Sequence, residues 1–68
     1  MKDKKIYTFE VFGIKNKRLG STGDECLTKS EMILKAQGML QGALMFRSQV
    51  SVKVREKGCE EYCFELKS

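Results

Sequence analysis

One amphipathic helix, more than any other feature of the sequence, restricts the folds that this 68-residue chain can adopt. Thr28 and Glu31 have the spacing of a capping box, in which each side chain accepts a hydrogen bond from the other's backbone amide. The apolar periodicity that follows predicts a helix over 28–47. Its core-facing stripe is Met32, Ile33, Ala36, Met39, Leu40, Ala43, Leu44 and Phe46. Because a chain of this length closes only one core, a single helix has to pack on a sheet.

Segments rich in aromatic and β-branched residues flank the helix and predict the strands of that sheet. The first strand is expected over 5–14, with alternate side chains on opposite faces. Residues 15–27 contain glycine, serine and asparagine, and they predict a loop. The residues expected on the core face of the first strand are Tyr7, Phe9 and Val11.

The C-terminal residues 49–67 alternate twice between apolar and polar side chains, which predicts a β-hairpin. The parity of the two strands favours a three-residue turn at 56–58, with Gly58 in the left-handed region. The predicted cross-strand pairs are Val52 with Tyr62, Val50 with Phe64 and Lys53 with Glu61.

These elements make residues 1–68 one α+β domain, a single helix packed on a three-stranded, mainly antiparallel sheet in the order β-α-β-β. The last strand is expected at the centre of the sheet, where all its pairings are antiparallel. This order is similar to that of the small flavin-storing dodecins. The tryptophan that stacks on flavin in that family has no counterpart in a sequence without tryptophan. We therefore expect no cofactor.

The residue types that are missing exclude several chemistries. Without histidine there is no Ser-His or Cys-His nucleophile pair and no His-ligated metal, so we expect neither an enzyme nor a metal site. Cys26, Cys59 and Cys63 are odd in number and too widely spaced for a disulfide scaffold. With no apolar stretch of membrane-spanning or signal-peptide length, the sequence predicts a cytoplasmic chain that does not enter membranes.

The net charge of +4 is concentrated near the N-terminus. Lys15, Lys17 and Arg18 form the densest basic cluster, and they are candidate contacts for an anion or a nucleic acid. The same cluster also suits a solvated loop tip, and the sequence favours this second interpretation because a nucleic-acid-binding domain usually carries a denser basic stripe.

The sheet face opposite the helix is expected to carry charges of both signs, which favours cross-strand ion pairs over a nucleic-acid platform. Phe12 lies on this face and offers one ring for stacking. The charged residues expected there are Glu10, Lys53, Arg55, Glu61 and Glu65.

The helix side turned away from the sheet is a candidate contact surface, because it combines apolar residues with two glycines. Its residues are Leu34, Gly38, Gln41, Gly42 and Met45. The first function that the sequence suggests is therefore a small non-enzymatic binding or regulatory protein that acts through protein contact, as a homo-oligomer or with another partner. Its size suits an accessory protein or inhibitor of phages or mobile elements. The alternative is a nucleic-acid-binding module that uses the basic N-terminal strand and loop.

Overall fold

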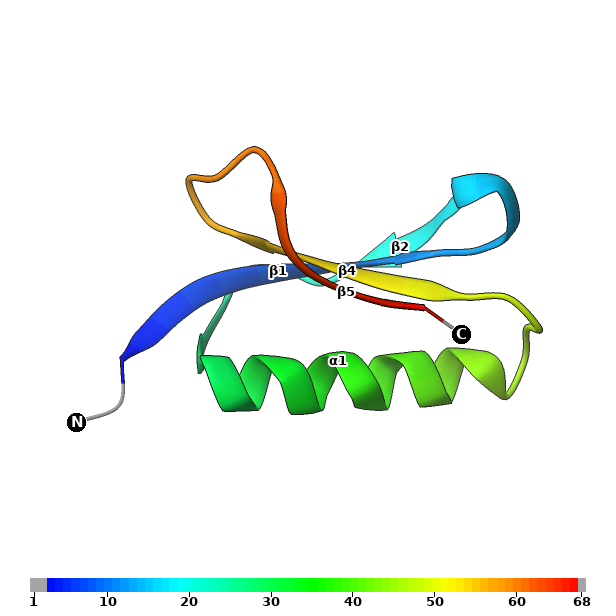
Figure 1. The fold of residues 1–68 in the computed structure, drawn as a ribbon, viewed down its shortest axis with the longest axis horizontal. Helices are drawn as coiled ribbons and strands as arrows, with labels where there is room; N and C mark the ends of the chain where they lie inside the picture. The colour runs from blue at the N-terminus through cyan, green and yellow to red at the C-terminus, as the bar shows by residue number, and fades with distance from the viewer. Residues whose placement is uncertain (1–2, 68) are drawn as a thin grey trace.

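The computed structural model describes residues 3–67, which form one long helix and a five-stranded antiparallel sheet. The helix covers one face of the sheet and leaves the other face open (Figure 1). The α+β class is confirmed, whereas the expectation of three strands is wrong. The elements are β1 (Lys4–Phe12), the 3-10 helix η1 (Ile14–Asn16), β2 (Arg18–Ser21), β3 (Glu25–Thr28), α1 (Lys29–Leu44), β4 (Ser51–Glu56) and β5 (Tyr62–Lys67).

The two additional strands come from the segment 15–27, which the sequence predicted to be a loop. β2 pairs with the second half of β1 and β3 with its first half, so both lie along the same edge of this long strand. Between them, the Thr22 amide donates to the Phe9 carbonyl, and the Phe9 amide donates to the Thr22 hydroxyl. β2 follows β1 across the short connection 13–17, whereas β3 pairs with the distant beginning of β1. In both cases the exposed edge of β1 is covered by a segment whose own β-propensity is low.

This return of the chain along β1 also changes the strand order. The sheet runs β2-β1-β4-β5, with β4 antiparallel to β1 and β5 at the edge, so the expected central position of the last strand is wrong. β2 and β3 bring the chain back to the start of β1, and α1 then carries it to the other end. β4 therefore enters beside Phe12 and runs antiparallel to β1 without an intervening strand.

The core lies between α1 and the inner face of β1 and β4. Phe9, Val52 and Val54 are the largest fully buried side chains, and Met32 and Ala36 pack on them from the helix. Tyr7 is buried and Val11 is half-buried at the margin of this cluster. The core face predicted for the first strand is thus confirmed, although β1 ends at Phe12 and not at residue 14.

The helix begins as predicted and ends earlier. The Thr28 hydroxyl accepts from the Glu31 amide at 3.2 Å, and the Glu31 carboxylate accepts from the Thr28 amide at 2.9 Å, so the capping box is confirmed. α1 ends at Leu44, where the chain tightens and the Phe46 amide donates to the Ala43 carbonyl three residues back. Phe46 consequently leaves the core stripe and is 86% exposed, which corrects its predicted position.

The hairpin forms, but its predicted register is wrong. Gly58 has a φ of 91°, as expected, whereas the connection between the strands spans 57–61 and not 56–58. The shift of four residues leaves glutamates in the turn and sets two apolar residues of β5 against the buried valines of β4. A shift by an even number of residues leaves each side chain on the same face of the sheet. The alternation of apolar and polar residues therefore cannot distinguish the predicted register from the observed one. The observed pairs are Val52 with Leu66, Lys53 with Glu65, and Val54 with Phe64.

A bulge in β5 moves one aromatic residue to the other face. Val54 pairs with Phe64 while Arg55 pairs with Tyr62, so Cys63 is the extra residue of the bulge. Tyr62 thereby joins the open face, where its ring contacts Phe12. Cys63 instead lines a hollow with Tyr7 on the helix side, which corrects its expected place on the polar face.

Candidate binding surfaces

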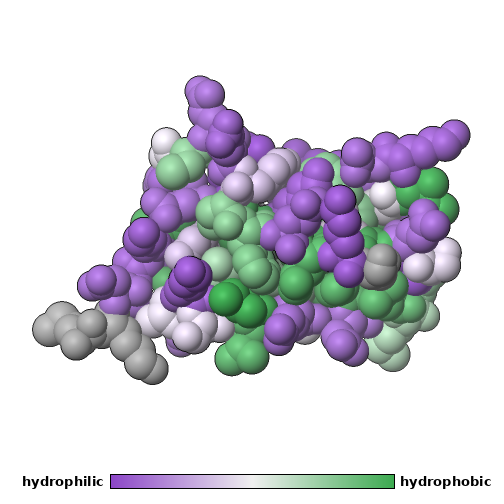
Figure 2. Space-filling model, viewed as in Figure 1, coloured by the Kyte–Doolittle hydropathy of each residue, from purple (hydrophilic) through white to green (hydrophobic). Residues whose placement is uncertain are grey.

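The outer side of α1 is the first candidate surface. The five residues predicted there are all exposed, and the sheet covers none of them. Leu34 is 67% exposed and Met45 is 79% exposed, and they lie three helical turns apart in the same direction. Between them, apart from the neighbouring residues and the backbone of the helix itself, nothing lies within 4 Å of where a Cβ would stand on Gly38 or Gly42. Figure 2 shows apolar side chains, with hydrophilic ones between them, along this lower side of the molecule.

The open face of the sheet is the second candidate surface, and its centre is the carboxylate of Glu10. Glu10 is only 7% exposed, because Arg18 from β2 and Arg55 from β4 lie on either side of it. The Glu10 carboxylate oxygens are 3.6 Å from Arg18 Nε and 3.8 Å from Arg55 Nη2. Lys53 Nζ is 3.7 Å from Glu65 Oε2 on the neighbouring strand. The expected cross-strand ion pairs are therefore present, although Glu61 lies in the turn and takes no part.

Two aromatic rings lie among these cations. The Phe12 and Tyr62 centroids are 6.5 Å apart, with the rings nearly perpendicular. The Lys53 ammonium is 4.9 Å from the first centroid and 5.3 Å from the second, and the Arg55 guanidinium is 4.5 Å from Tyr62. Cation–π contacts of this kind hold the cations in place beside the rings. The sequence indicated only Phe12, because the bulge that turns Tyr62 outward leaves no signal in the alternation.

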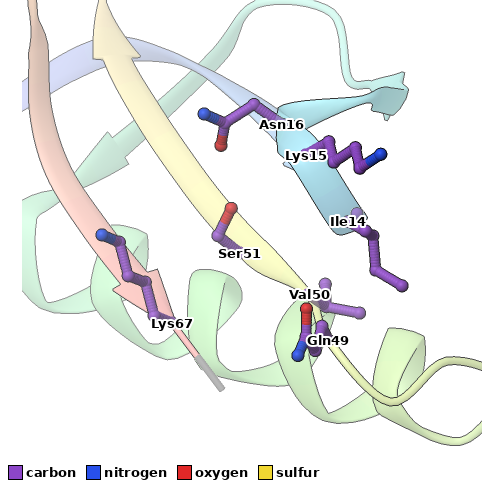
Figure 3. A pocket seen from close by; sticks show the side chains of 8 residues that line it. Ile14, Lys15, Asn16, Gln49, Val50, Ser51 and Lys67 are labelled. Atoms are coloured by element: carbon purple, nitrogen blue, oxygen red, sulfur yellow. The ribbon is translucent and has the colours of Figure 1, made fainter.

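A hollow of about 370 Å³ adjoins this ring cluster. It lies where η1 faces the beginning of β4 and the end of β5 (Figure 3). Lys15 and Asn16 on its rim both have left-handed backbone angles, with φ values of 60° and 58°. Ser51 and Lys67 are cross-strand partners on its other side, and Ser51 also pairs with Phe12. A polar and basic hollow is thus continuous with the aromatic residues.

The predicted basic cluster does not stay together in the structure. Arg18 joins the ion pairs around Glu10, and Lys15 lies at the hollow. Lys17 lines a separate, smaller hollow with Leu19 and Arg47. The structure therefore divides these three candidate anion contacts among different surroundings, two of which belong to the open face.

The cysteines contribute no metal or disulfide site within residues 3–67. Cys26, Cys59 and Cys63 are free and exposed, and no group of three or more His, Cys, Asp or Glu side chains in this range could hold a metal ion. Burial raises the pKa of the Cys63 thiol above its usual value, which lowers the fraction of the nucleophilic thiolate.

No protein-family model matches the sequence, and neither the curated proteins nor the solved structures give a match. Within residues 3–67, no helix is long and apolar enough to span a membrane. A function for the chain has to be inferred from its own residues.

Proposed function

We propose that this protein is a small non-enzymatic binding protein that acts through protein–protein contact at the outer side of α1, and that its first partner is a second copy of itself. The observation that carries the proposal is the exposure of Leu34 and Met45, two large apolar side chains, on the side of α1 turned away from the sheet. Burying a large apolar side chain contributes about 1.5–3 kcal/mol, so covering both would add substantially to the stability of so small a domain.

The arrangement of residues on this face suits a symmetric antiparallel helix pair. A two-fold axis near residues 39 and 40 would place Leu34 of one copy against Met45 of the other. It would also place Gly38 against Gln41 and Gly42 against Gln37. Each longer polar side chain would then meet a glycine, and no like charges would be opposed, as a self-complementary contact requires. An accessory regulator of this kind would present the open sheet face of both copies to other molecules.

The proposal is tested by replacing Leu34 and Met45 with glutamine, which keeps helix propensity and net charge while removing the apolar contact. We expect the wild type to sediment as a dimer at high concentration and L34Q/M45Q to sediment as a monomer with unchanged circular dichroism. Ile14→Gln is the control, because Ile14 is an apolar residue that is 58% exposed and lies outside α1. A wild type that remains monomeric at every accessible concentration would overturn the self-association.

A further inference from the structure

We infer that the open face of the sheet binds single-stranded nucleic acid, with unpaired bases at the Phe12–Tyr62 ring pair and backbone phosphates at the adjoining basic hollow. This surface is distinct from the helix face, since the sheet separates the two (Figure 1). The inference goes beyond the proposed protein contact and does not depend on it.

The charge of this face favours an anionic ligand. Four cations contributed by three different strands line its centre, beside the carboxylates of Glu10 and Glu65. A third carboxylate, Asp24, lies at the Thr8 end of the face and is paired with Lys57. The buried Glu10 already has two arginines beside it, so a ligand would meet the outer parts of the guanidinium groups and not the carboxylate. The Arg55 Nε atom is buried and has no hydrogen-bond partner within the described residues. The cations are Arg18, Lys53, Arg55 and Lys67.

The rings distinguish a nucleic acid from a simple polyanion. Base–aromatic stacking is tolerant of sequence and is the usual means by which sheet surfaces hold single strands. Tyr62 is partly exposed at the edge strand β5, so one side of the ring pair is open to a ligand. The cations beside the rings would add contacts to a stacked base or its neighbouring phosphate. In a duplex the bases are already stacked on each other, so the same rings would gain little from double-stranded DNA.

The geometry provides a continuous path for such a strand. Phe12, Ser51 and Lys67 follow one another across β1, β4 and β5, so the hollow begins where the ring pair ends. Figure 3 shows the side chains of Asn16, Ser51 and Lys67 around this hollow. Hydroxyl, amide and ammonium groups are the donors that bind phosphate oxygens. Within residues 3–67, neither Lys15 nor Lys67 is held by an ion pair, which leaves both ammonium groups available.

The test is fluorescence anisotropy with a labelled oligothymidylate of about ten nucleotides and a duplex of the same length. We expect the single strand to bind more tightly than the duplex, with affinity that decreases as salt increases. K15Q/K67Q should lower the magnitude of the salt slope by about 1.4, because each single-strand phosphate contact contributes about 0.7. Tyr62→Leu, which keeps an apolar side chain, should weaken binding about tenfold through the loss of stacking.

The matched control is K4Q/K29Q, which removes the same charge from exposed positions outside the ring pair and the hollow. It should leave the affinity nearly unchanged. Three outcomes would overturn the inference: no binding at low salt, equal losses in the control and in K15Q/K67Q, or an affinity that Tyr62→Leu does not alter. The last outcome would mean that the binding is only the general attraction of a basic protein for polyanions. None of these variants touches the helix face, so failure here leaves the dimer test intact.

Discussion

Thr28 shows how much a single side chain decides in this chain. Its hydroxyl and the Glu31 carboxylate satisfy two backbone amides that the first turn of α1 would otherwise leave without a partner. Thr28→Ala removes the hydroxyl, and we expect a loss of about 1 kcal/mol in the free energy of unfolding, measured by urea denaturation. Ser30→Ala, two residues further along the first turn at an exposed position, should cost much less. Equal losses in the two variants would contradict a capping role for Thr28.

Among the secondary-structure elements, the β4–β5 hairpin depends on the backbone conformation of one turn residue. Gly58 has a φ of 91°, which an L-amino acid adopts only at a cost, although a Cβ would meet no atom there. We therefore expect Gly58→Ala to lower the free energy of unfolding by about 1 kcal/mol through backbone strain alone. Gly23→Ala is the matched control, because it is equally unobstructed and does not have a positive φ. Thermal denaturation of the two variants at the same concentration distinguishes strain from loss of flexibility in the unfolded chain.

The secondary-structure elements also show which features can be predicted from the sequence and which cannot. The capping box, the turn glycine and the inner face of β1 depend on neighbouring residues, and each follows from local spacing. β2 and β3 form because β1 offers them an edge to pair with, and their own residues show no strand-like pattern that would predict them. The hairpin register likewise depends on which valines the helix buries. The aromatic pair on the open face was missed for the same reason, since Tyr62 reaches it through a bulge.

At the scale of the whole molecule, one sheet separates two exposed surfaces of different chemistry. The outer side of α1 carries large apolar side chains, whereas the open sheet face is basic and aromatic. A two-fold contact between helices would leave both open faces free and pointing away from each other. Dimer formation would then place the two proposed nucleic-acid surfaces on opposite sides of the assembly. A strand long enough to pass around the dimer would contact both, and linking the two contacts would raise the overall affinity without any new contact.

The glycines of α1 allow the dimer to be tested through stability as well as size. In the monomer, replacing Gly38 and Gly42 with glutamine should raise the stability of the fold, because each glycine in a helix costs close to 1 kcal/mol relative to good helix formers. Both positions are open in the monomer, so glutamine meets no obstacle there. In the dimer, the longer side chains would block the close approach of the two helices. We therefore expect the Tm of the wild type to rise with protein concentration, as for any protein stabilised by association. For G38Q/G42Q we expect a higher Tm at low concentration and no concentration dependence. A double variant whose Tm still follows concentration as in the wild type would place the contact elsewhere on the molecule.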